Sequence, residues 1–457
     1  MTDMLVPGPA TATADPSAVR PGLLAVPGEA AYDEARVAWN LAVEQRPAAV
    51  ALPTDADEVA EVVRHAADRG LRVTAQGTGH NAGPLGDLSD TILIRTHLMR
   101  RVQIDAPAQV ARAEAGALWM DVVIPAAEFG LVAMHGSSPD VGVVGYTLGG
   151  GMSWYSRKYG TAASRVLAIE AVTADGEQVR ADRHHHAELF WALRGGGGSF
   201  AIVTAIEFEL IAIGAIQAGG LWFELDRASE VWHAWREWAP TLPDHVSTSV
   251  RLLNIPPIPE APEAIRGKSF ALILVSVLGD EAEADRHLAP LRALEPQMDT
   301  VVRTDPKDMV HLAMDPPQPV PAVGVSAILD EFTPDAVDAI VEQAARVKSL
   351  VVAYVTLGGG AQARRSASGV MTGLDTPYAF FAAGIAPPPV KELTEAEMAG
   401  VKAAIEPHAS DRDYLNFAES ATDLERFFGA EAYARLRDVK RAVDPAGRIR
   451  ANHDIVA

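Results

Sequence analysis

Three glycine-rich stretches in the first half of the chain constrain its fold more than any other feature. They occupy residues 76–83, 142–151 and 189–200, and the first of them carries His80 directly after a segment with the pattern of a strand, 71–75. Glycine lets a backbone approach a ligand closely and adopt positive φ. Three such loops in one half of a chain predict a large, flat, phosphate-bearing cofactor that is held by main-chain N–H groups.

The composition excludes several classes of protein. The 457 residues permit two or three domains with a large core. A net charge of −21 disfavours nucleic acids and anionic membrane surfaces as partners, although solubility alone also explains it. The chain has no cysteine, which excludes disulfides, thiolate metal sites and cysteine nucleophiles. No long apolar stretch or export signal is recognised, so we expect a cytoplasmic protein with a flexible tail over residues 1–28.

The pattern of apolar residues divides the remainder into three parts. Residues 29–215 begin with a β-α-β unit, whose helix has Thr54 as its expected N-cap, and continue with short strands and hairpins. Residues 216–404 alternate apolar, β-prone segments with helices, which predicts an antiparallel sheet backed by helices. Residues 405–457 contain a short aromatic segment that we expect to be a strand, followed by a charged helix at about 423–443.

Two helices of the middle part have recognisable start signals. Thr333 followed by Pro334 predicts an N-cap with proline in the first helical position. Thr394 with Glu397 three residues later matches a capping box.

Several catalytic motifs are absent from the glycine-rich stretches. Neither later run has the Gly-Lys-Ser/Thr of a phosphate-binding P-loop or the spacing of a dinucleotide fingerprint, and no G-x-S-x-G nucleophile elbow occurs. The histidines at 184–186 follow one another in a charged loop and have no distant partner motif, so we predict no metal site.

Three residues stand out as candidates for chemistry. The ring of His80 can donate to a ligand, act as a base or be alkylated by an electrophilic cofactor, or it is an ordinary loop histidine. Tyr414 and Asn416 lie two apart on the expected strand and would point the same way. A tyrosine can act as a base and an amide can bond a polar ring edge, although a core strand explains the pattern equally well.

Together these segments resemble the FAD-linked oxidoreductases of the p-cresol methylhydroxylase/vanillyl-alcohol oxidase type, in the berberine-bridge-enzyme-like branch. Residues 76–80 match the R-[SG]-G-G-H turn of that branch, with the histidine kept and the arginine and one glycine replaced. Residues 138–151 match C-P-x-V-G-x-G-G-x-x-x-G-G-G, with Ser138 in place of cysteine. Residues 188–204 match D-L-F-W-A-x-R-G-G-G-G-x-F-G-[VI]-V-T, and residues 414–417 match Y-x-N-[YF].

The resemblance covers about 30–215 and 405–457, and it implies a two-domain α+β fold of the PCMH-type FAD-binding class. The FAD-binding domain would be discontinuous, built from 29–215 and 405–457, and 216–404 would form the substrate domain. The expected cofactor is FAD, covalently bound through His80 only, because Ser138 cannot form a thioether. The resemblance implies the following cofactor-binding residues: Gln76, Gly77, Thr78, Gly79, His80, Asn81, Gly83, Ser138, Pro139, Val141, Gly142, Gly145, Tyr146, Gly149, Gly150, Val203, Asn416 and Asn452.

The implied activity is that of an FAD-dependent oxidoreductase, and we expect an oxidase. It would remove a hydride from a C–H beside an O–H or N–H of a small organic substrate, with dioxygen reoxidising the flavin. Tyr414 is the expected catalytic base and Tyr378 a weaker candidate. Two alternatives stay open: a flavin dehydrogenase with another electron acceptor, and a degenerate flavin fold that serves as a binding protein.

Overall fold

The computed structural model describes residues 19–257, 259, 263–316, 318–364 and 366–457. Most of the expected tail, residues 1–18, lies outside this range. Its described end is not free, because Leu24–Ala25 (β1) pairs with the strand β2 (Ala49–Ala51). In the part of the chain that is described, no helix is long and apolar enough to cross a membrane.

The first sheet brings the two ends of the chain together. Its order is β1, β2, β4 (Thr91–Arg95), β3 (Arg72–Gln76) and β20 (Ile449–Arg450), and the strands from β2 to β20 are parallel. Helix α2 (Ala56–Asp68) connects β2 to β3 and packs its valines against the sheet. Strand β3 therefore ends directly before the loop that carries His80.

Helix α2 begins one residue later than the sequence predicts. Its N-cap is Asp55, whose carboxylate accepts the N–H of Glu58 at 2.9 Å, and not Thr54. The Thr54 hydroxyl instead donates to the Glu58 carboxylate at 2.9 Å.

The second sheet is antiparallel and carries the other two glycine-rich stretches. Its order is β5 (Val102–Asp105), β6 (Val110–Glu114), β10 (Ile202–Glu209), β8 (Val166–Val172) and β9 (Gln178–Asp182). One face packs into the largest described apolar cluster with the following helices: α3 (Trp119–Ala127), α4 (Val143–Leu148), α6 (Ala187–Leu193) and α12 (Ala430–Val443). A short ribbon of β7 (Leu131–Val132) and β11 (Ile211–Ala212) follows.

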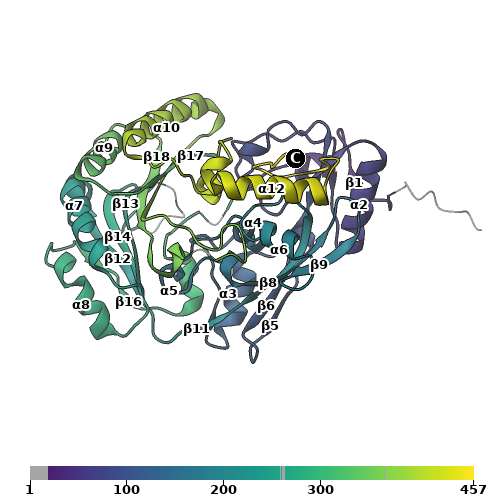
Figure 1. Ribbon diagram of the computed structural model, residues 1–457. Helices are drawn as coiled ribbons and strands as arrows, with labels where there is room; N and C mark the ends of the chain where they lie inside the picture. The colour runs from purple at the N-terminus through teal and green to yellow at the C-terminus, as the bar shows by residue number, and fades with distance from the viewer. Residues whose placement is uncertain (1–18, 258, 260–262, 317, 365) are drawn as a thin grey trace, which may run out of the picture.

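A larger antiparallel sheet forms the other side of the molecule (Figure 1). It has the order β15, β12, β14, β13, β18, β19 and β17, with β16 also paired to β12. The strands are β12 (Gln217–Glu224), β13 (Val246–Asn254), β14 (Ser269–Val277), β15 (Met298–Asp299), β16 (Val302–Arg303), β17 (Ala322–Leu329), β18 (Leu350–Leu357) and β19 (Tyr378–Ile385). This confirms the predicted helix-backed antiparallel sheet.

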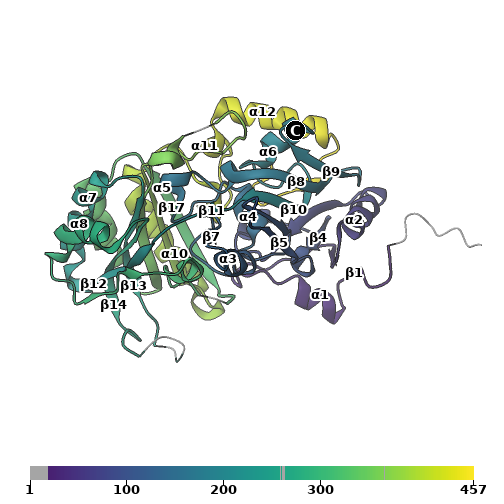
Figure 2. The ribbon, with the colours of Figure 1, turned by 90° about the horizontal axis from the view of Figure 1, so that it is seen from below.

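Helices cover only one face of this large sheet. They are α7 (Ala228–Trp238), α8 (Glu281–Arg292), α9 (Pro334–Ala344) and α10 (Lys391–Ile405), which pack into one core with the sheet. Helices α7 and α8 lie at the outer edge of the molecule in both views (Figures 1 and 2). Because side chains alternate along a strand, Phe380 packs under the helices while Phe381 faces the opposite way. The uncovered face turns toward the glycine-rich loops.

Of the two capping signals predicted in the middle part, one is confirmed and one is wrong. Thr333 is the N-cap of α9, as predicted, and its hydroxyl accepts the N–H of Ala336. The capping box at Thr394 was wrong, because α10 begins at Lys391 and the Thr394 hydroxyl inside it donates to the Ile385 carbonyl. The Glu397 carboxylate instead accepts from the neighbouring Ser349 hydroxyl at 2.6 Å.

Two predictions in the C-terminal part also need correction. Residues 415–417 form a 3-10 turn, η10 (Leu415–Phe417), and not a strand. The charged helix is interrupted at Gly429, whose φ of +77° separates α11 (Glu425–Phe428) from α12. Glycine reaches this left-handed conformation without strain, which allows α12 to leave in a new direction across the second sheet (Figure 1).

Candidate functional site

A cavity of about 490 Å³ lies between the glycine-rich loops and the uncovered face of the large sheet. Both chain ends contribute to it, since its lining includes Trp39 near the N-terminus and Asn452 near the C-terminus. Fifteen of the predicted cofactor-binding residues line it: Gln76, Gly77, Thr78, Gly79, His80, Asn81, Ser138, Val141, Gly142, Gly145, Tyr146, Gly149, Val203, Asn416 and Asn452. The fold therefore gathers segments that are far apart in the sequence.

His80 is held in a defined orientation at the wall of this cavity. Its ring stacks on Trp39 with the centroids 4.0 Å apart, and its Nδ1 shares a hydrogen bond of 2.8 Å with the Thr78 hydroxyl. Its Nε2 lies 3.6 Å from Oδ1 of Asp140 and has no hydrogen-bond partner among the described residues. One ring nitrogen is thus free to react or to bond a ligand.

Asp140 organises the surroundings of His80. Its carboxylate accepts from Trp39 Nε1 at 2.5 Å and from the Ser138 hydroxyl at 2.9 Å. Burial alone would raise the pKa of Asp140, but the nearby His80 ring, together with the hydrogen bonds from Trp39 and Ser138, lowers the pKa overall. The Asp140 carboxylate therefore holds Trp39 and Ser138 in place around the His80 ring.

The first loop is fixed from below by a pair of buried amides. Gln76 and Gln45 exchange two hydrogen bonds, of 2.9 and 3.0 Å, through their side chains. Gly79 has φ +88°, and a Cβ there would lie 2.8 Å from Gln76 Nε2. Glutamine in place of the family's arginine therefore supports the turn that presents His80.

The second loop runs into α4 and lies against the C-terminal motif. A Cβ on Gly149 would lie 1.7 Å from Oδ1 of Asn416, so only glycine lets this backbone approach so closely. Gly145 lies in α4 and has open space where a Cβ would be, and the nearest atom for Gly142 is 3.9 Å away. The helix thus presents bare backbone to the cavity.

These features fit a cofactor with polar groups on a flat ring system. Nε2 of His80 and Oδ1 of Asn81 are buried at the cavity without hydrogen-bond partners within the described ranges. Buried polar atoms are rarely left unpaired, because losing water without a new partner costs about 1–3 kcal/mol. A bound ligand would supply the missing partners, and the glycine backbones leave room for it.

Tyr414 and Asn416 do converge, although not through strand alternation. Nδ2 of Asn416 donates to the Tyr414 hydroxyl at 3.1 Å and to the Tyr146 carbonyl at 2.9 Å. Burial raises the pKa of Tyr414, while hydrogen bonds from Asn416 and from the backbones of Met152 and Gly151 act to lower it. Several donors therefore point at one phenolic oxygen in a buried position.

The opposite wall of the cavity is aromatic and charged. Arg251, Tyr354 and Phe381 are cross-strand neighbours on β13, β18 and β19, and all three face the cavity. The guanidinium of Arg251 lies 4.6 Å from the centre of the Tyr354 ring, and Phe417 lies 5.4 Å from Phe381. The C-terminal motif and the large sheet therefore meet through aromatic contacts.

Glu419 adds a carboxyl group to this wall. Its Oε2 accepts the N–H of Gly324 at 2.8 Å, and a Cβ on Gly324 would lie 2.6 Å from the carboxyl carbon. Burial raises the pKa of Glu419 to about 7, although the Gly324 bond acts to lower it. The side chain keeps partial exposure because the cavity reaches it. Its charge state can therefore change near neutral pH.

Three predicted cofactor residues support the cavity from behind and do not line it. A Cβ on Gly83 would lie 2.5 Å from the Glu419 carbonyl, and one on Gly150 would lie 3.0 Å from the Met371 sulfur. The Pro139 carbonyl accepts the N–H of Met120 in α3.

The structure does not bring Tyr378 to the cavity, which corrects its candidacy as a base. It has the same strand parity as Phe380, so it points under the helices, where its ring lies 5.8 Å from Phe332 and 6.2 Å from Trp235. Among the aromatic residues of this sheet, Tyr354 and Phe381 line the cavity, while Phe223 packs in the helix-covered core.

Sequence analysis missed Trp39, Asp140, Arg251 and Glu419 as site residues. Arg251 was detectable in principle, since it is the single charged residue of its strand, and such a charge must be paired or functional when buried. Trp39 carried no local signal, because it reaches His80 only through the tertiary fold.

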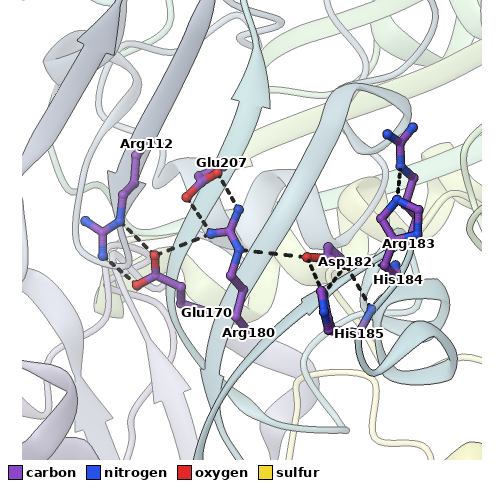
Figure 3. Close-up of polar contacts among 8 residues, drawn as sticks. All are labelled: Arg112, Glu170, Arg180, Asp182, Arg183, His184, His185 and Glu207. Atoms are coloured by element: carbon purple, nitrogen blue, oxygen red, sulfur yellow. Dashed lines mark hydrogen bonds and ion pairs between the residues drawn. The ribbon is translucent and has the colours of Figure 1, made fainter.

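The histidines at 184–186 lie in the exposed loop between β9 and α6, and Figure 3 shows His184 and His185 beside Asp182. The Asp182 carboxylate accepts the backbone N–H of His184 at 2.7 Å and contacts the His185 ring at 3.0 Å. The rings of His184 and His185 are 6.5 Å apart, and the His184 ring contacts Arg183. Beside them, Arg180 pairs with Glu207 in a charged network on the surface (Figure 3).

Comparison with known proteins defines the class to which this fold and site belong. Residues 47–182 match the family model described as FAD binding domain. The chain is 30% identical over 282 residues to (R)-6-hydroxynicotine oxidase of Paenarthrobacter nicotinovorans, which is 60% of this chain and 58% of that protein. The match thus spans little more than half the length of this relative.

Solved structures extend the likeness over the whole fold. The 6-hydroxy-D-nicotine oxidase from Arthrobacter nicotinovorans has a TM-score of 0.81 and 25% identity, covering 97% of this chain and 99% of that one. Wild-type BBE-like 1 of Physcomitrella patens has a TM-score of 0.82 and 18% identity, covering 94% and 96%. The fold is the PCMH-type FAD-binding fold. The chain contains an FAD binding domain, is similar to the FAD-linked oxidoreductases of the p-cresol methylhydroxylase/vanillyl-alcohol oxidase type, and shares the fold of the berberine-bridge-enzyme-like branch.

Proposed function

We propose that the protein is an FAD-dependent oxidase of a small organic substrate that has a C–H beside an O–H or N–H. One observation carries the proposal: a single cavity joins the glycine-rich loops and His80 to the aromatic wall formed by Tyr354 and Phe381. The first side fits a flavin and the second fits a small, partly apolar substrate above it. The names of the relatives, which include an oxidase of 6-hydroxynicotine, support this class of reaction.

We propose that FAD is bound covalently through His80. The free Nε2, the stacking on Trp39 and the neighbouring Asp140 carboxylate present the ring as a nucleophile in one orientation. Backbone groups of Gly77, Gly142 and Gly145 would contact the cofactor, and Asn81 would offer its unpaired oxygen.

Bound FAD would supply the acceptor for the hydride of the substrate C–H, and dioxygen would take up the two electrons with two protons as hydrogen peroxide. The protein has to remove the proton of the adjacent O–H or N–H. We propose Tyr414 as its acceptor, because this residue lines the cavity and, although burial raises its pKa, hydrogen bonds from Asn416 and two backbone N–H groups oppose that rise. Glu419 is the second candidate, since its raised pKa of about 7 suits a base at neutral pH.

Acid precipitation tests the cofactor proposal directly. The pellet of the purified protein should be yellow and carry the added mass of FAD, and the His80→Ala variant should release its flavin into the supernatant. Flavin in the wild-type supernatant would contradict the covalent bond alone. A protein that contains no flavin and takes none up would contradict the oxidase and favour a binding protein with a degenerate flavin fold.

Tyrosine variants test the base. Tyr414→Phe should slow anaerobic reduction of the flavin by substrate about 100-fold or more, in the range that general base catalysis contributes. Tyr378→Phe is the matched control, because that ring lies on the other face of the sheet, and it should leave the rate unchanged. If Glu419→Gln abolishes reduction while Tyr414→Phe does not, the base is Glu419.

The electron acceptor is tested by mixing reduced protein with air-saturated buffer in a stopped-flow instrument. Rapid return of the oxidised flavin spectrum supports the oxidase. Reoxidation slower than turnover with an artificial acceptor would instead indicate a dehydrogenase.

A further inference from the structure

A cluster of metal-ligand side chains lies on the helix-covered side of the large sheet. It contains His245, directly before β13, and Glu283 and His287 on α8. None of the three lines the flavin cavity, so the cluster has no part in the proposed oxidation. Because Glu283 and His287 are four residues apart on one helix, their side chains lie on the same face, one turn apart.

The three side chains converge on one point. One ligand atom from each lies within 4.8 Å of the other two, and Nε2 of His245 is 2.8 Å from Oε1 of Glu283. Zinc holds nitrogen and oxygen ligands at about 2.0–2.2 Å, so ligand atoms around one tetrahedral ion are about 3.4 Å apart. Small side-chain rotations that move the ligand atoms by about 1 Å would bring them to the spacing required around one ion.

Two ring nitrogens of the cluster have no hydrogen-bond partner. Nε2 of His245 and Nε2 of His287 are buried, and neither forms an aligned hydrogen bond with any described residue, despite the short distance to Glu283. The rings approach each other with centroids 5.7 Å apart. Histidine nitrogens are common metal ligands, so two unpaired ring nitrogens beside one carboxylate form a candidate ligand set.

The backbone around the cluster is firmly placed. The His245 carbonyl accepts the N–H of Leu278 at 3.0 Å, and the His287 carbonyl accepts Trp238 Nε1 at 2.9 Å. Gly279 has no side chain, and a Cβ there would lie 2.1 Å from Oε2 of Glu283, so the carboxylate folds over this glycine. The ligand set therefore rests on fixed elements and not on a free loop.

We propose that His245, Glu283 and His287 bind a divalent transition-metal ion, zinc by preference, with water completing the coordination. Two histidines and one carboxylate suit zinc, and the absence of thiolate ligands leaves nitrogen and oxygen donors only. The ion would join the start of β13, an interior strand of the large sheet, to α8 and would stabilise that end of the sheet. Its role is structural, because the cluster is separated from the cavity.

A simple ion pair is the competing explanation. Glu283 also lies 3.4 Å from the Arg286 guanidinium, which could neutralise it without a metal. That explanation predicts no metal binding and leaves both ring nitrogens unpaired. The two explanations are separated by measuring the metal itself.

The test uses tag-free protein with its natural flavin content. Zinc is titrated into metal-stripped protein against a chromophoric chelator, and cobalt is added separately to record the visible absorption of a four-coordinate site. We expect one zinc per chain, a higher melting temperature with zinc, and an affinity at least about tenfold lower in His287→Ala and in His245→Ala, because one of three ligand bonds is lost.

Two control variants exclude other sites. His233→Ala removes a histidine that has a single carboxylate partner, Asp338, at 2.9 Å, and it should bind zinc as the wild type does. A variant with alanine at 184–186 removes the exposed histidine loop, and it should also keep the site. If the wild type binds no zinc, or if only the loop variant loses it, the proposal is wrong. Since His287→Ala could fail to fold, Glu283→Gln provides a milder variant with the same expected loss.

Discussion

Glu419 is an ionisable residue whose burial opposes its ionisation. Its carboxyl group is largely buried at the cavity wall, has one backbone donor at 2.8 Å, and has no cation paired with it within the described residues. Buried carboxyl groups without a counter-charge hold their proton more tightly than exposed ones. Its partner Gly324 approaches closely because glycine leaves space for the carboxylate.

This conflict predicts a dependence of stability on pH. Burial raises the folded-state pKa of Glu419 from 4.5 to about 7, so the folded protein binds the proton more tightly than the unfolded chain. The contribution to the free energy of unfolding is therefore largest below about pH 4.5 and is lost as pH rises to about 7, by up to about 3 kcal/mol. Glu419→Gln cannot ionise, so its unfolding free energy should fall less over this range.

Denaturant unfolding of both proteins at pH 5 and pH 8, with equal flavin content, measures the difference. The variant should gain stability relative to the wild type at pH 8 and gain little at pH 5. An equal difference at both pH values would show that Glu419 does not carry the shifted pKa.

At the scale of elements, two glycines at α4 have different structural roles. Gly149 ends the helix against Asn416, while Gly145 leaves backbone exposed to the cavity. Gly149→Ala should displace Asn416, break its bonds to Tyr146 and Tyr414, and destabilise the fold by about 1–3 kcal/mol. Gly145→Ala should keep or raise stability by up to about 1 kcal/mol, because alanine favours a helix, yet weaken flavin binding.

Both variants are best compared in a His80→Ala background, where the flavin binds reversibly on our proposal. Thermal unfolding of the flavin-free forms and flavin fluorescence titration separate the two effects. If Gly145→Ala loses as much stability as Gly149→Ala, then Gly145 does not have open space for a Cβ.

Sequence patterns predicted elements where the pattern is local. The strands of the large sheet and the N-cap at Thr333 have their periodicity and capping residues in one continuous segment, and both were confirmed. The strand at Tyr414–Asn416 and the capping box at Thr394 failed, because tertiary hydrogen bonds decide the conformation there. Glycine motifs located one wall of the cavity, but Arg251 and Glu419 reach it only through strand pairing and chain reversal.

For the whole molecule, the closing step of the fold is the return of the chain end to the first sheet. β20 pairs in parallel with β3, and the helix before it, α12, crosses the second sheet (Figure 1). A buried ion pair fixes this return: Lys440 Nζ lies 2.8 Å from Asp444 and also donates to the carbonyls of Ser199 and Ile449. One side chain thus links the third glycine-rich stretch, the last helix and the last strand.

Removing one partner of that pair should destabilise the whole protein. Lys440→Met would leave Asp444 charged and buried, and breaking a buried pair in this way costs about 3–5 kcal/mol. The neighbouring Arg441 pairs with Asp438 on the surface, so Arg441→Met should cost at most about 1 kcal/mol. Chemical denaturation should show one cooperative transition shifted strongly in the first variant and barely in the second. A separate early transition of the FAD-binding part, with the substrate sheet still folded, would show instead that the C-terminal return stabilises only its own domain.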